Sequence, residues 1–323
     1  MYVMKKLIGI LCLLLILSCT KDDNRTSSSS SFDENKLTGF LNLYPLIESP
    51  LFKSVSSTTL NNNELVGVVL VNSRVLVFPY SFFQQYEIIN VEYLGKKFAV
   101  SYCPITKSCI AFEREGIFRA SGYLYNENLA PWDQETETIW SQMLMRGLVG
   151  PRKSNTLKVI PLVQVNWGLI KTYYSYSKVL DTNMVISSKI NTPDNPDNSD
   201  NSDNVELPSV NELTYGIINN SSVKMFKYSD FLNGNIKNIS DGSYKYLVYG
   251  NSNYKIINAF KVNDYNNYTE LASEYFPYVL EGANGVKYDV FGRSTNGINL
   301  ENNSKSFVAA WWAWDSFYEN IYF

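Results

Sequence analysis

No histidine occurs among the 323 residues. The imidazole side chain titrates near neutral pH, acts as the base in Ser-His-Asp and Cys-His catalysis, and is the commonest protein ligand of metals. Its absence therefore excludes these catalytic arrangements and all imidazole metal sites. We predict no cofactor and no metal site.

Basic runs are absent as well, and 28 Lys and Arg against 31 Asp and Glu give a net charge of −3. Proteins that bind nucleic acid carry clustered Lys and Arg that contact phosphates. The composition therefore predicts that nucleic acid is not a partner. Long amphipathic helical patterns are also missing, which argues against a doubly wound parallel fold.

The apolar run at the N-terminus covers residues 7–17, which is shorter than the roughly 20 residues that a membrane-spanning helix needs. A short apolar run after two lysines is typical of a secretion signal. It ends in Ile16-Leu17-Ser18-Cys19, which resembles the lipobox of bacterial lipoproteins. We predict a signal peptide at 1–18 and an acylated Cys19 whose partner is the lipid bilayer. The alternative is an ordinary secretory signal with an incidental cysteine.

The residues after Cys19 read Thr20-Lys21-Asp22-Asp23, which resembles the signal that exports lipoproteins of the Bacteroidota to the outer face of the outer membrane. The alternatives are a solvated charge cluster and a location on the periplasmic face. A polar, serine-rich stretch follows that lacks the apolar surface needed for a core. We therefore predict that residues 19–40 form a flexible tether.

A repeat relates two parts of the remaining chain. Asn72-Ser73 matches Asn220-Ser221, and Ala111-Phe112 matches Ala259-Phe260, at a constant offset (220 − 72 = 148). This offset is the same at residue 72 and at residue 112, and a register that is kept over such a stretch indicates an old duplication. We predict a first unit at 41–185, an Asn/Asp/Ser-rich linker or loop at 186–209, and a degenerate second unit at 210–323.

Short β-branched and aromatic runs alternate with turn residues in each unit, which is typical of strands. The predicted strands of the first unit lie at 66–71, 74–78, 97–102 and 110–112, with hairpin turns at Asn72-Ser73 and Gly95-Lys96. Short helices are predicted at 140–145 and 311–318. The predicted fold class is a β-rich α+β protein of two homologous units, each a small mixed sheet or partial barrel with a short helix, packed against one another.

Several motifs occur in a fixed order along the first unit: Phe78-Pro79-Tyr80, Ser101-Tyr102-Cys103-Pro104-Ile105-Thr106, Trp132-Asp133-Gln134-Glu135-Thr136, Trp140-Ser141-Gln142 and Gly150-Pro151. Together they resemble the domain of unknown function family 3179, and the second unit fits that family's weaker second half. Some members carry a second cysteine or a selenocysteine three positions after the first, which implies redox chemistry in those members. This chain has Thr106 there, and Tyr86 where the family tends to have histidine.

Cys103 is the first candidate for chemistry, because a thiol with a lowered pKa acts as a nucleophile or a soft metal ligand. Three alternatives remain open at this point. Cys103 forms a structural disulfide with Cys109, or both are buried unpaired thiols, or Cys103 has a redox or metal-binding role.

Polar residues that follow the family motifs are the second set of candidates. Glu87, Arg114 and Asp133 are candidate catalytic residues, and Asn126, Asn128, Trp140 and Gln142 are candidate binding residues. A Glu87/Asp133 pair would serve as acid and base on a glycan if the two carboxyls stood at glycosidase distances. The alternative is that these residues satisfy backbone groups at turns and strand ends.

The sequence therefore predicts a membrane-anchored, surface-exposed binding or structural module, with a glycan or another small molecule as its ligand. Aromatic residues, 15% of the chain, would stack on sugar rings or fill the core. The alternative function is an extracytoplasmic enzyme that uses the Cys103 thiol or the Glu87/Asp133 carboxylate pair.

Overall fold

The computed structural model describes residues 32–182, 209–240, 242 and 244–323, which belong to one compact unit. The predicted signal peptide, the predicted lipidated Cys19, the start of the tether and nearly all of the linker at 186–209 lie outside the described residues. Within the described ranges, none of the helices is both long and apolar enough to cross a membrane.

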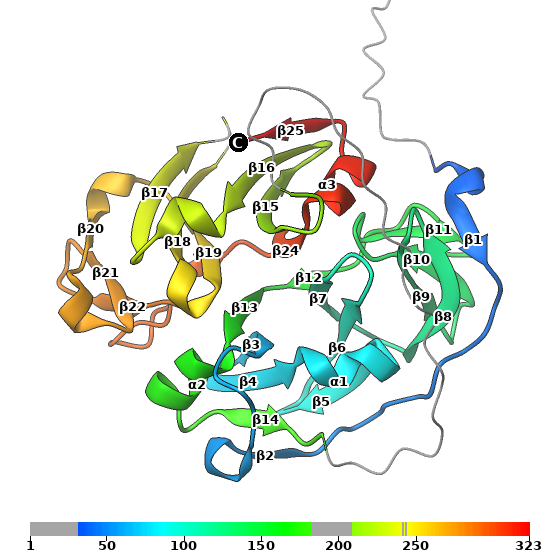
Figure 1. Ribbon diagram of the computed structural model, residues 1–323, viewed down its shortest axis with the longest axis horizontal. Coiled ribbons are helices and arrows are strands. Elements are labelled where there is room, and N and C mark those ends of the chain that lie inside the picture. Colours follow the sequence, from blue (N-terminus) through cyan, green and yellow to red (C-terminus); the bar gives the residue numbers. More distant parts are fainter. Residues whose placement is uncertain (1–31, 183–208, 241, 243) are drawn as a thin grey trace, which may run out of the picture. The chain divides into compact units, whose positions relative to one another are not determined.

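The first half of this unit contains three sheets and two short helices (Figure 1). Sheet A has the order β1-β8-β9-β10-β11, formed by Leu37–Gly39, Phe118–Tyr125, Asn128–Asp133, Thr138–Ser141 and Arg146–Val149. Sheet B has the order β12-β7-β6-β5, formed by Val159–Ile160, Ser108–Glu113, Lys96–Cys103 and Ile88–Tyr93. Sheet C has the order β13-β3-β4-β14-β2, formed by Leu162–Asn166, Leu65–Val71, Arg74–Pro79, Lys178–Leu180 and Phe52–Ser54. The helices are α1, Tyr80–Tyr86, and α2, Trp167–Tyr173.

The second half contains three further sheets and one α-helix, α3, Trp311–Phe317. Sheet D has the order β24-β15-β16-β25, formed by Ser306–Ala310, Leu213–Asn219, Ser222–Lys227 and Asn320–Tyr322. Sheet E has the order β17-β18-β19-β23, formed by Asn235–Ser240, Lys245–Asn251, Ile256–Val262 and Glu301–Asn302. Sheet F has the order β20-β21-β22, formed by Tyr268–Glu270, Tyr278–Gly282 and Lys287–Asp289. Short 3₁₀ helices lie at Glu34–Lys36, Val55–Ser57, Tyr228–Phe231, Ser252–Tyr254, Tyr265–Asn267 and Ser273–Tyr275.

The β-rich fold class is confirmed, although each half has three sheets where one was predicted. Sheets C and D are both mixed, because a final strand that follows a short helix pairs in parallel with the preceding hairpin. The strand order β13-β3-β4-β14 of sheet C has the same connectivity as β24-β15-β16-β25 of sheet D. Likewise, β12-β7-β6-β5 has the same connectivity as β23-β19-β18-β17. The two halves thus share one strand order.

The predicted strands of the first half are present as β3, β4, β6 and β7, and the helix predicted at 311–318 is α3. The hairpin turn at Asn72-Ser73 is confirmed, whereas the second turn lies one residue earlier, at Leu94-Gly95, where both residues have positive φ. The helix predicted at 140–145 is wrong. Trp140 pairs with Gly147 across β10 and β11, and the intervening residues form a turn that Met145 closes with a φ of 51°.

Residues 32–40 were predicted to belong to the tether, but they are attached to the first half. Phe32 stacks on Tyr125 at a ring-centroid distance of 5.6 Å, and β1 pairs with β8 in antiparallel register. These contacts use the edge of sheet A, whose backbone groups would otherwise lack partners in the sheet.

The strands alternate their side chains between two hydrophobic clusters. In β3, Val66 and Val68 face one cluster, and Val69 and Val71 face another, as the two-residue period of a strand requires. One cluster fills the space between sheets B and C within the first half, and its counterpart fills the space between sheets D and E within the second half. Each of these two clusters therefore belongs to a single half.

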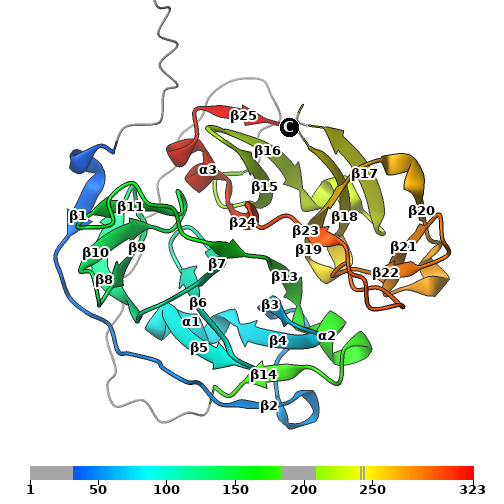
Figure 2. The ribbon, with the colours of Figure 1, turned by 180° about the vertical axis from the view of Figure 1, so that it is seen from behind.

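The other two clusters combine residues from both halves. The free face of sheet C and helix α2 bury their side chains with sheets E and F, for example where Tyr174 meets Phe291 at 4.8 Å between ring centroids. Sheet D and helix α3 bury theirs with sheets A and B, where Trp314 is fully buried. Figures 1 and 2 show α3 between β15–β16 and the strands β10–β11 from both sides. The two halves therefore share their cores.

The close approach of α3 to sheet D depends on Gly216. A Cβ atom at this position would lie 2.7 Å from the Trp314 ring, which is closer than real contacts allow. Trp314 also donates from Nε1 to the Thr214 carbonyl at 3.4 Å. Trp167 and Trp314 are at most 1% exposed, so these two tryptophans are core residues and not candidates for stacking on a ligand.

Candidate functional site

A buried polar cluster lies between sheets A and B of the first half. Its members are fully buried hydroxyl and amide side chains. They are Ser101 on β6, Thr106 in the turn before β7, Ser108 on β7, Asn128 on β9 and Gln142 directly after β10. Burying polar groups costs free energy unless each finds a partner. We call this set the polar cluster.

Asn128 and Gln142 connect the cluster through their amides. Asn128 donates from Nδ2 to Thr106 Oγ1 and to Gln142 Oε1, each at 2.8 Å. Gln142 Oε1 also accepts from the Ser108 hydroxyl at 2.6 Å, and Gln142 Nε2 donates to Ser101 Oγ at 3.0 Å and to the Ser101 carbonyl at 3.1 Å. Asn128 Oδ1 accepts from the backbone N–H of Met143 at 3.2 Å. Every amide atom of these two predicted binding residues is therefore used inside the protein.

The Cys103 thiol lies beside this cluster and is 1% exposed. The Leu129 backbone N–H donates to Cys103 Sγ at 3.4 Å, and the side chain and backbone N–H of Thr106 also bond to the sulfur. Burial raises the pKa of the Cys103 thiol, and these hydrogen bonds oppose that rise only in part. A raised pKa keeps Cys103 a neutral thiol, so it lacks the thiolate that a nucleophile needs.

Cys109 lies on the opposite face of the same hairpin. Tyr102 is the residue opposite Cys109 and Ser108 is opposite Cys103, so the two cysteines point to different clusters. Both thiols are free. The Cys109 thiol bonds to the Tyr80 hydroxyl, and burial raises its pKa well above the ordinary value. The structure therefore favours buried unpaired thiols over the Cys103–Cys109 disulfide.

Glu87 is a carboxylate close to Cys103. It ends helix α1 with a φ of 54°, and its carbonyl accepts from the Tyr102 N–H at 2.8 Å. Burial raises the pKa of Glu87 to about 7. Its charge also contributes to the raised pKa of Tyr44, for which burial is the larger cause. Among the residues described, no group of three or more His, Cys, Asp or Glu is arranged to hold a metal ion.

Asp133 lies at the far end of β9 from this region. It accepts from the Thr136 hydroxyl at 2.7 Å and from the Glu135 N–H at 3.2 Å, which stabilises the turn between β9 and β10. Leu129, which contacts Cys103, lies four residues earlier, or about 13 Å at the rise of a strand. The described side-chain hydrogen bonds of Asp133 are thus with its own turn and not with Glu87.

The remaining candidates are also engaged in the structure. Arg114 donates to the backbone carbonyls of Phe98, Gly116 and Val91 at 3.0 to 3.5 Å. Asn126 is in a turn with a φ of 52°, and its side chain donates to the Ser316 carbonyl of α3. The structure thus disperses Cys103, Arg114 and Asp133 instead of gathering them in one pocket.

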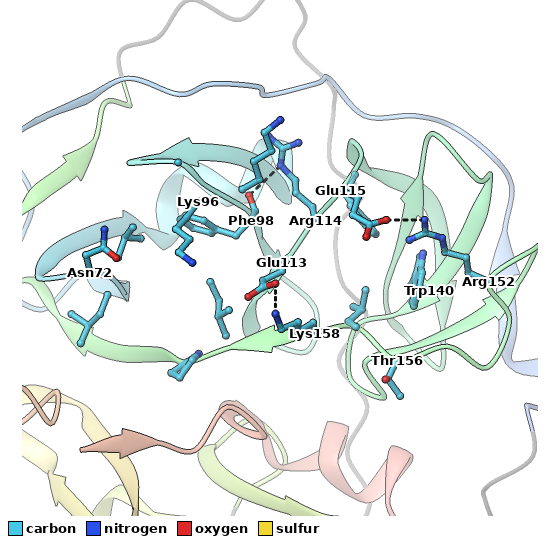
Figure 3. Close-up of a pocket in the computed structure, with 18 residues that line it drawn as sticks. Asn72, Lys96, Phe98, Glu113, Arg114, Glu115, Trp140, Arg152, Thr156 and Lys158 are labelled. Atoms are coloured by element: carbon cyan, nitrogen blue, oxygen red, sulfur yellow. Dashed lines mark hydrogen bonds and ion pairs between the residues drawn. The ribbon is translucent and has the colours of Figure 1, made fainter. Parts of the chain in front are cut away.

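An open groove of about 650 Å³ lies at the end of strands β6 and β7 that is opposite to Cys103 and Ser108. Its floor is apolar and includes Phe98, Phe118 and Trp140. Its rim carries the basic residues Lys96, Lys97, Arg114, Arg152 and Lys158 and the acidic residues Glu113 and Glu115. Figure 3 shows two ion pairs along it, Lys158–Glu113 at 2.6 Å and Arg152–Glu115 at 3.2 Å.

Sequence reasoning selected Trp140 and Arg114 but missed the other cations of the groove. Lys96, Arg152 and Lys158 come from three separate segments, so no local pattern joins them. Trp140 is 2% exposed, and its Nε1 has no hydrogen-bond partner within the described part of the chain. A buried donor without a partner costs free energy, so Trp140 is a buried side chain beneath the groove with an N–H that the described residues leave unsatisfied.

These features define a β-sheet protein with a closed polar cluster and an open basic groove in its first half. The model of the family described as protein of unknown function (DUF3179) matches residues 42–321. The chain therefore belongs to this family, as its motifs indicated. No curated protein and no solved structure matches the chain.

The raised pKa of Glu87 makes a prediction about stability. Its pKa is about 7 in the folded protein and 4.5 as the ordinary value, so its protonated form favours folding. The stabilising contribution is complete below pH 4.5 and is lost as the pH rises through 7. We therefore expect Glu87→Gln to leave stability unchanged at pH 4.5 and to raise the free energy of unfolding at pH 8 by up to about 3 kcal/mol.

Urea unfolding at the two pH values measures this difference. Glu127→Gln is the matched control, because Glu127 also has a positive φ but is exposed. The control should show no pH-dependent gain. An equal gain at pH 4.5 and pH 8 for Glu87→Gln would show that its carboxyl is not protonated preferentially in the folded state.

Proposed function

We propose that this protein is a membrane-tethered binding module whose groove holds an acidic sugar or a similar organic anion. The observation that carries the proposal is the excess of positive charge above an apolar floor. Five basic and two acidic side chains line the groove, a difference of +3 (5 − 2), on a chain whose net charge is −3. Charge of this sign concentrates anions at the groove.

Two cations of the groove are available for a ligand. Lys96 makes no ion pair in the described part of the protein. Arg114 is held in place by three backbone carbonyls and likewise has no carboxylate within ion-pair distance there. Burial lowers the pKa of Arg114, which reflects a cation that nearby carboxylates only partly compensate. A fixed guanidinium of this kind binds a carboxylate or sulfate without losing much side-chain entropy.

The floor of the groove supports the ring of such a ligand. The half-buried lining residues Leu70, Ile160 and Pro161 offer apolar surface, whereas Phe98 and Trp140 lie buried beneath it. Burying the apolar face of a sugar ring against such a surface removes it from water and is favourable. An acidic sugar combines an apolar ring face with a carboxylate or sulfate group, and thus fits both parts of the groove.

The enzyme alternative has less support. The Cys103 thiol is sealed and neutral, and Glu87 lies beside it and not in the groove. The two carboxylates that line the groove, Glu113 and Glu115, are each paired with a cation. A general acid needs a raised pKa and a free approach to the substrate, and an ion pair works against both.

We also propose that Cys19 is acylated and that the module is displayed on the outer face of the outer membrane. The lipobox-like and export-signal-like residues carry this part of the proposal. The shared connectivity of the two halves, together with the spacing of β3 and β15 (213 − 65 = 148), supports their origin by duplication. The groove lies on the first half alone, so the duplicated halves have diverged in function.

The groove predicts selective binding of anions by the full chain. In isothermal titration calorimetry we expect glucuronate to bind and glucose, which has the same ring without the carboxylate, to bind more weakly at this site. Lys96→Glu should weaken glucuronate binding about tenfold, because it reverses one charge near the ligand. Added salt should weaken the binding further.

Lys171→Glu is the matched control, because Lys171 is exposed on α2 and does not line the groove. It changes the net charge equally and should leave the affinity unchanged. An unchanged affinity for glucuronate in Lys96→Glu, or a glucose affinity that equals that of glucuronate and falls equally in Lys96→Glu, would contradict the proposal.

The proposed anchor predicts a change of location on removal of the thiol. Expressed in a bacterium that processes lipoproteins, the full chain should label with a radioactive fatty acid and sediment with membranes. Cys19→Ser should lose the label and appear in the soluble fraction, because one acyl chain or more supplies the membrane affinity. Cys12→Ser, inside the predicted signal peptide, is the control and should keep the label.

A further inference from the structure

A second cleft lies in the second half of the protein. Its volume is about 330 Å³, and it opens between the end of α2, the end of strand β18 and the segment that joins β20 to β21. Aromatic rings and uncharged polar groups make up most of its lining, with one carboxylate, Glu270. None of the described residues that line it is Lys or Arg, so its chemistry differs from that of the basic groove.

A rigid aromatic wall forms one side of the cleft. Tyr254 and Phe276 stack with their ring centroids 4.9 Å apart and an interplanar angle of 10°. Tyr173 packs edge-on against Phe276 at 4.7 Å, and its hydroxyl lies 3.3 Å from the Tyr254 hydroxyl. Tyr173 comes from the first half and the other two from the second, so the shared core fixes the wall. Rings held in this way lose little entropy when a ligand packs on them.

Hydrogen-bonding groups line the same cleft. Asn251 is 6% exposed, and its Nδ2 reaches the Tyr249 hydroxyl only at 3.5 Å, so this amide retains donor capacity. The Tyr249 hydroxyl lies near Glu270, whose charge adds to the burial that raises the pKa of Tyr249 to about 12. Gly234 leaves room for these two groups, because a Cβ there would lie 2.8 Å from Asn251 Nδ2 and 3.0 Å from Tyr249 Oη.

The cleft lies at a position of the second half whose equivalent in the first half is filled by side chains. Asn251 ends β18 as Cys103 ends β6, and the residues that pair with them, Ile256 and Ser108, begin the next strand in each case. In the first half this position is filled by the polar cluster. Because the same connectivity gives a filled interior in one half, the opening in the other is a property of its side chains and not of the fold.

We infer that this cleft binds a neutral sugar, with a ring face against Tyr254 and hydroxyl groups bonded to Glu270, Asn251 and Tyr249. An anion is disfavoured by Glu270 and by the lack of basic residues in the lining. A quaternary ammonium group requires several ring faces around one point, whereas Tyr254 and Phe276 stack on each other. The volume is at the small end of ligand pockets and suits about one or two sugar rings.

Saturation-transfer NMR and calorimetry on the full chain test this inference, with glucose, galactose, N-acetylglucosamine and maltose as probes up to about 20 mM. We expect at least one of them to bind. Tyr254→Ala and Glu270→Gln should each weaken that binding at least about fivefold. Glu270 is exposed, so its variant tests the site even if Tyr254→Ala fails to fold.

Two control variants distinguish sugar binding in this cleft from sugar binding elsewhere on the protein. Tyr275→Ala removes a neighbouring tyrosine that is 45% exposed and does not line the cleft, and it should bind the sugar normally. Lys96→Glu alters only the basic groove and should also bind normally, so failure of the anion proposal leaves this test intact. Tetramethylammonium is titrated as well, as a quaternary ammonium probe. The inference is overturned if none of the sugars binds, if both cleft variants bind the sugar as the parent does, or if tetramethylammonium binds and the sugars do not.

Discussion

The burial of each mixed sheet against the opposite half is the interaction on which the rest of the structure depends. Sheet C with α2 covers sheets E and F, and sheet D with α3 covers sheets A and B. Neither half could bury these faces alone, and large apolar faces that are exposed to water favour association. The reciprocal packing also places α2 beside the cleft of the second half, and it places the start of α3 beside the polar cluster, where the Ala310 N–H donates to the Thr106 carbonyl at 2.8 Å.

The same constraint explains why the family's motif residues are buried. Gln142 and Asn128 lie where sheets A and B meet under α3, and Tyr318 after α3 donates to the Met143 carbonyl at 2.9 Å. Water cannot reach this region, so each polar group must find its partner within the protein. Asn128 and Gln142, which the sequence indicated as candidate binding residues, therefore form part of the hydrogen-bonded interior of the fold.

The strands were predictable because Val66–Val71 and the residues around them alternate between two apolar faces, with Asn72-Ser73 as the turn. The faces of Cys103 and Cys109 depend on the β6–β7 register, which the spacing of two cysteines does not reveal. The helix wrongly predicted at 140–145 rested on apolar residues that enter the core from a strand and a turn. Neither the groove nor the cleft was predictable, because each assembles side chains from segments far apart in the sequence.

We infer from the shared cores that the two halves form one cooperative unit in which Cys103 is a sealed, structural thiol. Alkylation of the full chain along a denaturant series, read peptide by peptide in a mass spectrometer, tests it most directly. We predict that Cys103 and Cys109 are both protected in the native protein, are not bonded to each other, and become reactive together in one transition that coincides with the loss of tryptophan fluorescence. Rapid alkylation of Cys103 in the native state, or its exposure in a transition separate from that of Cys109, would contradict the account.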